Sequence, residues 1–179
     1  MISFNIVSRL KPTTSFRKRS SINMATPKYN AEFISAILKR SLYASFNTLN
    51  GDKINSRIMV FASDPDLKNF YCLTNKTSEK IAQLGRNPFA NLLILGTSDK
   101  LDGNSETQVQ GTVQLFTKFT DKEVKTALDM LSEKSSMMST VKDSGSLGDF
   151  CIISVRTAEI TFRVFKDILQ NIPKTTLKF

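Results

Sequence analysis

The chain reads NSRIMVF over residues 55–61 and FYCLTNKTSEKIAQLGRNP over residues 70–88, and this stretch carries the strongest structural signal in the sequence. The first run and the start of the second are rich in β-branched and aromatic residues, which is typical of β-strands. The second strand leads directly into a cluster of hydroxyl and ammonium side chains that opens a short helix. Free backbone N–H groups at a helix start, together with Ser, Thr and Lys side chains, attract anions. The sequence therefore predicts a phosphate-binding site at this junction.

The formal charge of +9 is concentrated near the N-terminus. Six basic residues precede the first acidic residue, Glu32, and the chain after residue 31 carries 19 basic and 16 acidic side chains. These are interspersed along the chain, whereas a surface that binds duplex nucleic acid gathers its basic residues into a patch or stripe. We therefore expect nucleic acid not to be the partner, and a basic nucleic-acid-associated protein is the least favoured function.

Residues 1–24 contain Ser, Thr, Lys and Arg but no acidic residue. This composition is typical of an organellar transit peptide, and a plain disordered tail is the alternative. A transit peptide would direct the protein to mitochondria, whereas a tail would leave it in the cytoplasm. No run reaches the roughly 18 consecutive apolar residues of a membrane span. We divide the chain into a leader at 1–29, one domain at 30–168 and a C-terminal tail at 169–179.

The chain has no histidine and only two cysteines, Cys72 and Cys151, which both lie in apolar runs. Without histidine, Ser-His-Asp and Cys-His nucleophiles and HExxH zinc sites are excluded. Two cysteines that lack a CxxC spacing predict neither a zinc site nor a disulfide framework. Any catalysis would therefore depend on a cofactor, a lysine or a carboxylate.

Local patterns predict a mainly β protein with packed helices. The expected helices, with apolar residues at helical spacing, are 31–41 with Asn30 as N-cap, 78–85 capped by Thr77 or Ser78, and 122–133 capped by Thr120. The expected strands are 42–49, 54–61, 69–73, 89–95, 107–116, 150–155 and 159–164.

Two features of the loops complete this interpretation. Asn50-Gly51 supplies the positive φ of a tight hairpin, and residues 98–105 form a polar loop in a second hairpin. The Ser-, Met- and Gly-rich segment 135–148 is interpreted as a linker, and a mobile loop over the ligand is the alternative. The order of elements contains no βαβ alternation, so the prediction is an antiparallel barrel with helices packed outside.

In these motifs and their order, residues 30–165 resemble the FMN-binding split β-barrel family related to pyridoxamine 5′-phosphate oxidase, especially its general-stress-protein branch. The matching pieces are Ser56-Arg57-Ile58-Met59, Tyr71-Cys72-Leu73-Thr74, Ser78-Glu79-Lys80 and Asn87-Pro88. The resemblance implies an antiparallel split β-barrel, an FMN cofactor and a homodimer with its flavins at the subunit interface.

The resemblance also implies which residues hold the phosphate of FMN. Arg57 and Lys80 would bind the phosphate, and Thr74 and Ser78 would donate hydroxyl hydrogen bonds to the phosphate or the ribityl chain. A planar guanidinium and an ammonium suit a group with nearly two negative charges, because hydrogen bonds between ionised groups are the strong kind.

A second set of residues would lie near the flavin ring. The backbone of Ile58, Met59 and Val60, together with Asn75, would face the isoalloxazine ring. Gln108 would approach the ring from the strand at 106–111. No side chain stands out as a proton donor, so the catalytic residues are unknown.

The departures from the family pattern argue against two of the functions known in that family. An Arg-x-His substrate clamp is absent, which argues against oxidation of vitamin B6, and the lack of histidine also disfavours haem ligation. The expected function is a flavin-dependent oxidoreductase that acts on an unidentified small molecule. A non-catalytic flavin-binding sensor or stress protein and a deazaflavin-dependent reductase are the alternatives.

Overall fold

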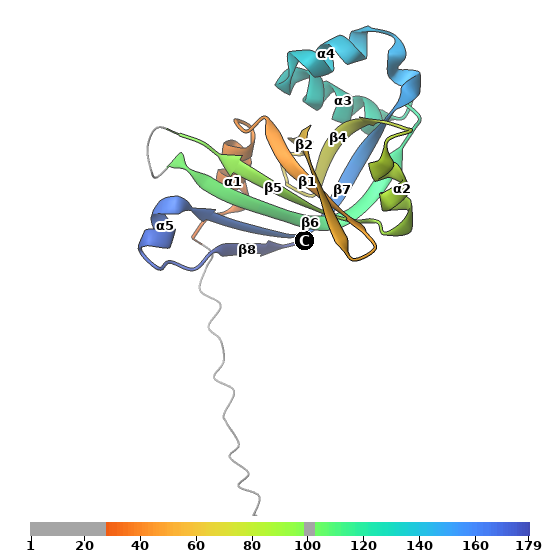
Figure 1. Ribbon diagram of the computed structural model, residues 1–179. Coiled ribbons are helices and arrows are strands. Elements are labelled where there is room, and N and C mark those ends of the chain that lie inside the picture. The colour runs from red at the N-terminus through yellow and green to blue at the C-terminus, as the bar shows by residue number, and fades with distance from the viewer. Residues whose placement is uncertain (1–27, 99–102) are drawn as a thin grey trace, which may run out of the picture.

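The computed structural model describes residues 28–98 and 103–179 (Figure 1). The expected transit peptide or tail at 1–24 lies outside the described residues, as does the middle of the expected polar loop. In the described part, no helix is long and apolar enough to cross a membrane.

The described residues form one eight-stranded sheet and several helices. The strands are β1 (Tyr43–Asn50), β2 (Lys53–Val60), β3 (Ala62–Ser63), β4 (Asn69–Asn75), β5 (Phe89–Gly96), β6 (Ser105–Phe116), β7 (Phe150–Val164) and β8 (Thr175–Lys178). The helices are α1 (Ala31–Leu38), α2 (Glu79–Arg86), α3 (Lys122–Lys134), α4 (Ser136–Asp143) and α5 (Phe165–Leu169), and a 3-10 turn, η2, spans Ser146–Asp149.

The sheet is antiparallel, with the strand order β2-β1-β5-β6-β7-β4-β3 and β8 paired to β7. It curls, so that β2 at one end of this order contacts β4 near the other end (Figure 1). Helix α2 packs on β1, α1 packs on β5, and α3 packs on β3, β4 and β7. The predicted antiparallel sheet with helices outside is confirmed.

The β1–β2 hairpin and the first helix follow the local sequence signals. Gly51 has φ 63° at the turn, where glycine carries no Cβ penalty. At the start of α1, the Asn30 side chain accepts a hydrogen bond of 2.9 Å from the Phe33 N–H. Both features were predicted from sequence.

The longest pairing, between β6 and β7, contains a bulge. The register shifts after the pair Gln110–Glu159, and the next pair is Gly111–Thr157, so Ala158 is the extra residue on β7. A Cβ on Gly111 would lie 2.2 Å from the carbonyl oxygen of Arg156. The two backbones can therefore approach this closely only because residue 111 is glycine. Bulges bend strands and increase their twist, which favours the curl of the sheet.

Two hydrophobic clusters lie on opposite sides of the curled sheet. The inner cluster fills the barrel and includes Phe46, Phe70 and Phe162. The second cluster lies between the sheet and the helices α3 and α4, and includes Tyr71 and Leu131. Successive side chains of β4 belong in turn to the inner and the second cluster, because neighbouring side chains of a strand point to opposite faces.

Lys134, at the end of α3, contacts the end of α1 and an aromatic ring of the inner cluster. Its Nζ donates a hydrogen bond of 2.9 Å to the carbonyl oxygen of Leu38 and lies 3.7 Å from the ring centroid of Phe61. Burial lowers the pKa of the Lys134 amine to about 8. The hydrogen bond to Leu38 joins the end of α1 to the end of α3.

Three sequence predictions about the second half of the chain were wrong. The segment 135–148 is not a plain linker, because it forms α4 and the start of η2, and Met138 of α4 is buried against α3. The two strands expected at 150–155 and 159–164 are one continuous strand, β7, which contains the bulge. The N-cap of α3 is Asp121 rather than Thr120.

The C-terminal residues, interpreted from sequence as a tail, add structure to the domain. Leu169 is the last residue of α5, and Thr175–Lys178 forms β8, which pairs with β7 from Glu159–Lys178 to Phe162–Thr175. At α5, the buried carboxylate of Asp167 accepts hydrogen bonds from Lys28 Nζ (2.5 Å) and the Tyr29 hydroxyl (2.8 Å). The two ends of the described chain are therefore held together.

The Gly111→Ala substitution is expected to lower the free energy of unfolding by about 1–3 kcal/mol, because the new methyl group overlaps the Arg156 carbonyl. Chemical denaturation followed by circular dichroism measures the change. Gly85→Ala is the matched control, since its Cβ in α2 would meet nothing within 4 Å. This control is expected to be neutral or to stabilise the protein by up to about 1 kcal/mol. Equal effects of the two substitutions would contradict the role assigned to the bulge.

Candidate functional site

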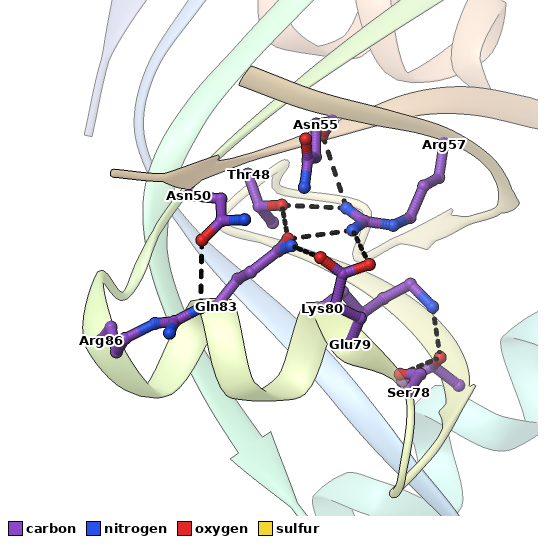
Figure 2. A network of polar contacts seen from close by, with 10 residues as sticks. Thr48, Asn50, Asn55, Arg57, Ser78, Glu79, Lys80, Gln83 and Arg86 are labelled. Atoms are coloured by element: carbon purple, nitrogen blue, oxygen red, sulfur yellow. Dashed lines mark hydrogen bonds and ion pairs between the residues drawn. The ribbon is translucent and has the colours of Figure 1, made fainter. Parts of the chain in front are cut away.

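The predicted anion site lies at the seam where β2, the end of β4 and the first turn of α2 meet (Figure 2). Arg57 comes from β2, an edge strand, and Thr74 from the end of β4. Ser78 is the residue before α2, and Lys80 lies in its first turn. These residues come together because the sheet curls and brings β2 next to β4.

The guanidinium of Arg57 is held from behind by a buried polar network. Arg57 Nη1 donates to Thr48 Oγ1 (2.9 Å), and Nη2 donates to Gln83 Oε1 (2.9 Å). The Thr48 hydroxyl also donates to Gln83 Oε1, at 2.7 Å. Gln83 is fully buried, so its carbonyl oxygen is a fixed acceptor inside the protein. Arg57 is therefore preorganised, with one edge of its side chain exposed at the seam.

Glu79 completes this network on the solvent side. Its Oε1 accepts a hydrogen bond of 2.6 Å from Gln83 Nε2, and its Oε2 lies 3.9 Å from Arg57 Nη2. The Glu79 side chain is 68% exposed, whereas that of Arg57 is 23% exposed. The Glu79 carboxylate at the start of α2 thus forms a loose ion pair with the half-buried guanidinium of Arg57.

Lys80 makes a second, neighbouring cluster with two hydroxyls. Its Nζ donates to Thr74 Oγ1 (2.9 Å), and Thr74 Oγ1 lies 3.2 Å from Ser78 Oγ. Burial and the nearby positive charge of Arg57 lower the pKa of the Lys80 amine. Two cations that repel each other at a surface seam would both be stabilised by an anion placed between them.

The structure brings four of the predicted phosphate ligands to one place: Arg57, Thr74, Ser78 and Lys80. Ser78 occupies the N-cap position of α2, as one of the two predicted caps, but its side chain makes no capping hydrogen bond and faces Thr74 instead. The hydroxyl that would cap the helix is thereby directed to the candidate site.

The residues expected near a flavin ring are divided between the faces of the sheet. Met59 lies half-buried against the inner cluster, and Val60 is buried in the second one. Asn75 is exposed, and its Oδ1 accepts hydrogen bonds from the N–H (2.8 Å) and the hydroxyl (2.6 Å) of Thr77. Ile58 is 70% exposed on the outer face.

Gln108 is not beside Arg57 within one chain. Arg57 lies in register with Phe46, Leu92 and Val109, which form the inner row of the sheet. Gln108 precedes Val109 and therefore points to the outer face, where its Nε2 donates to Glu106 (3.0 Å). Gln108 could approach a ligand only from the outer side of the sheet.

Sequence reasoning missed three residues of the site: Thr48, Glu79 and Gln83. Helical spacing carried a signal for two of them, since Glu79 and Gln83 are four residues apart and share one face of α2. The signal for Thr48 was weaker, because only the register of the β1–β2 hairpin places it across from Asn55 and close to Arg57.

The two cysteines are buried and free, as the sequence predicted. Burial raises the pKa of the Cys72 thiol to about 12. Cys151 pairs with Thr74 across β4 and β7, which places it behind the candidate site, and burial also raises its pKa. Both thiols stay protonated at neutral pH and act as small core residues.

No protein-family model matches the sequence, and no curated protein matches it. Solved structures do share its fold. A heme binding protein from Mycobacterium smegmatis aligns with a TM-score of 0.67 and 12% identity, over 86% of this chain and 60% of that chain. General Stress Protein 26 from Bacillus anthracis aligns with a TM-score of 0.55 and 19% identity, over 83% of this chain and 98% of that chain.

A third structure, the "Putative Pyridoxamine 5′-phosphate oxidase" of Listeria innocua, aligns with a TM-score of 0.53 and 20% identity, over 73% of this chain and 94% of that chain. At these identities the likeness establishes the fold. The chain therefore has the split β-barrel fold of pyridoxamine 5′-phosphate oxidase-like proteins, as the sequence predicted.

The Gln83→Leu substitution is expected to lower the free energy of unfolding by about 1–3 kcal/mol, because it leaves the Thr48 hydroxyl and the Arg57 guanidinium without their shared acceptor. Urea denaturation measures the loss. Gln114→Leu on β6 is the control, since Gln114 is exposed, and its effect is expected to stay within about 0.5 kcal/mol. A neutral Gln83→Leu variant would show that the network does not hold Arg57.

Proposed function

We propose that this protein binds FMN, with the phosphate at the seam between β2, β4 and α2. The observation that carries the proposal is the convergence of Arg57 and Lys80, from different elements, with the hydroxyls of Thr74 and Ser78. A guanidinium, an ammonium and two hydroxyls at the start of a helix form a donor set that suits a phosphate monoester.

The charge at the seam fits the phosphate group in sign and in placement. Arg57 is fixed by Thr48 and Gln83, so little conformational entropy would be lost when it binds an anion. Lys80 has its pKa lowered in the ligand-free protein, and an anion nearby would restore it. Binding of a dianionic group would thus remove the unfavourable approach of the two cations.

When bound, FMN would supply two-electron transfer between its isoalloxazine ring and a small molecule that is not identified. The chain's own contribution would be to anchor the phosphate and to place backbone from Ile58, Met59 and Val60 and from Asn75 along the ring. No side chain is assigned a catalytic role. The proposed class is a flavin-dependent oxidoreductase.

The main alternative is a non-catalytic flavin-binding protein that acts as a sensor or in a stress response. It is favoured by the likeness to General Stress Protein 26, which this chain covers over 98% of its length. A deazaflavin would use the same phosphate anchor. The Mycobacterium smegmatis protein is described as heme binding. This chain has no histidine that could ligate a haem iron, so haem is less favoured than a flavin.

The cofactor proposal is tested by titration of the purified protein with FMN, followed by visible absorbance and flavin fluorescence. Arg57→Ala and Lys80→Ala are each expected to weaken FMN binding by roughly 1.5–3 kcal/mol, because each removes one charge-assisted contact to the phosphate. Lys122→Ala, in the first turn of α3, is the control and should leave binding unchanged.

A folded protein that takes up no FMN would contradict the proposal. Uptake of a deazaflavin or of haem in its place would assign the site to that ligand, and the absorbance spectrum separates the three groups.

We further propose that the outer face of β1, β2 and β5 binds a second copy of this chain. Large apolar side chains are exposed on this face and alternate along β1 and β5 with buried positions, and along β2 mainly with half-buried ones: Tyr43, Leu49, Ile54, Ile58, Phe89 and Leu95. A hollow of about 530 Å³ on the same face is lined in part by Tyr43, Ile58 and Leu95. A polar row of Ser56, Asn47 and Asn91 runs between the two groups of apolar side chains. Large apolar side chains exposed on one face of a sheet favour association, and a two-fold dimer would cover the same face on both copies.

Such a homodimer would also place Gln108 at the subunit interface, since this side chain lies on the outer face of the neighbouring strand β6. The predicted approach of Gln108 to the flavin ring therefore depends on the dimer. Within one chain, the outer row that contains Gln108 also contains Ile58, Ser45 and Leu93.

The Ile54→Glu substitution is expected to raise the dissociation constant of the dimer at least about tenfold, because it buries an unpaired carboxylate at the interface. Sedimentation equilibrium measures the constant. Leu169→Glu is the matched control, since Leu169 on α5 is as exposed as Ile54 (72% and 70%) but lies on another element. A protein that stays monomeric at all concentrations would exclude the dimer.

A further inference from the structure

Glu79 places a negative charge at the centre of a site that is otherwise suited to an anion. It is the first residue of α2, and Figure 2 shows its carboxylate between Arg57 and the helix. Its Oε2 lies 3.9 Å from Arg57 Nη2. A dianionic phosphate at the same guanidinium would meet this carboxylate at close range.

Arg57 is held more firmly than Glu79, its partner in this ion pair. Arg57 is held by Thr48 and Gln83 through hydrogen bonds of 2.9 Å, and its side chain is mostly covered. Glu79 is 68% exposed and reaches the network through Gln83 Nε2. A rotation of the Glu79 side chain into solvent would leave the other contacts of Arg57 intact, whereas Arg57 cannot leave without breaking the buried network.

We propose that Glu79 is an internal counter-ion that occupies Arg57 in the ligand-free protein and that a phosphate group must displace in order to bind. This inference rests on the proposed phosphate site and adds a residue that sets its affinity and selectivity. In the free protein, the carboxylate offsets the repulsion between Arg57 and Lys80. In the bound protein, the phosphate takes over that role and the carboxylate turns to solvent.

The arrangement predicts selectivity for ligands with two negative charges. A ligand without a phosphate gains nothing from Arg57 while Glu79 remains in place. A ligand with a full phosphate monoester competes for Arg57 with two charges against one, and it also reaches Lys80. Glu79 would therefore lower the affinity for every phosphate ligand and have little effect on the same ligand without its phosphate.

The test compares the wild-type chain with Glu79→Gln, which removes the charge and keeps an oxygen that can accept from Gln83. Glu123→Gln is the matched control, because Glu123 is the acidic residue in the first turn of α3. FMN, riboflavin and inorganic phosphate are the probes, with flavin fluorescence and the thermal unfolding temperature as readouts. Circular dichroism establishes that each variant is folded.

The dissociation constant of FMN is expected to fall by about three- to tenfold in Glu79→Gln, the size expected for one partly screened charge. The constant for riboflavin should change by less than about twofold in the same variant. Without ligand, Glu79→Gln should unfold at a slightly lower temperature than the wild type, because the two cations lose their counter-ion.

Two results would overturn the inference while the FMN proposal stands: FMN binding in Glu79→Gln that is equal to or weaker than in the wild type, or an equal gain for riboflavin. If no chain binds FMN, the flavin proposal fails, and inorganic phosphate then decides the inference alone. A larger phosphate-induced stabilisation of Glu79→Gln than of the wild type would support it, and no difference would overturn it.

Discussion

The close approach of Gly111 on β6 to the Arg156 carbonyl on β7 lets the two longest strands bend together. The bulge at Ala158 adds to this bend. Beside the bulge, the Thr157 hydroxyl donates a hydrogen bond of 2.7 Å to the Leu67 carbonyl oxygen. Because the central strands bend, the ends of the sheet can approach each other, and β2 meets β4. The seam that holds the candidate site exists only as a consequence of this curvature.

The site places a buried hydrogen-bond acceptor, Gln83, behind a half-buried cation, Arg57. Gln83 has no exposed surface and presents one oxygen to both Thr48 and Arg57. Such an oxygen keeps a guanidinium in one orientation, which lowers the entropy lost on binding. Lys80, in contrast, is partly buried and donates to the neutral hydroxyl of Thr74, and burial together with the charge of Arg57 lowers the pKa of its amine. The two cations thus differ in how firmly they are held.

Strand β2 has a different role on each of its faces. Its inner face carries Arg57 and Met59, toward the seam and the inner cluster, and its outer face carries Ile54 and Ile58. An edge strand with exposed apolar residues is a risk for a monomer, since nothing covers it. A second copy packed on that face would protect the strand and would also fix the position of the cofactor anchor. The proposed dimer and the proposed cofactor site are therefore linked through one strand.

The sequence by itself determined the local structure: the β1–β2 hairpin at Asn50-Gly51, the cap at Asn30, the order of the main elements from α1 to α3 and the hydroxyl and lysine cluster that opens α2. These features depend on neighbours within a few residues, so periodicity and turn chemistry contain them. Helix α4 and strand β8 were missed because each is stabilised by packing on another element, α3 or β7, and lacks a clear pattern of its own. The meeting of Arg57 with Gln83 and Glu79 was decided by tertiary structure alone. The curl that joins them depends on the sum of many strand pairings, and no local pattern in the chain records that sum.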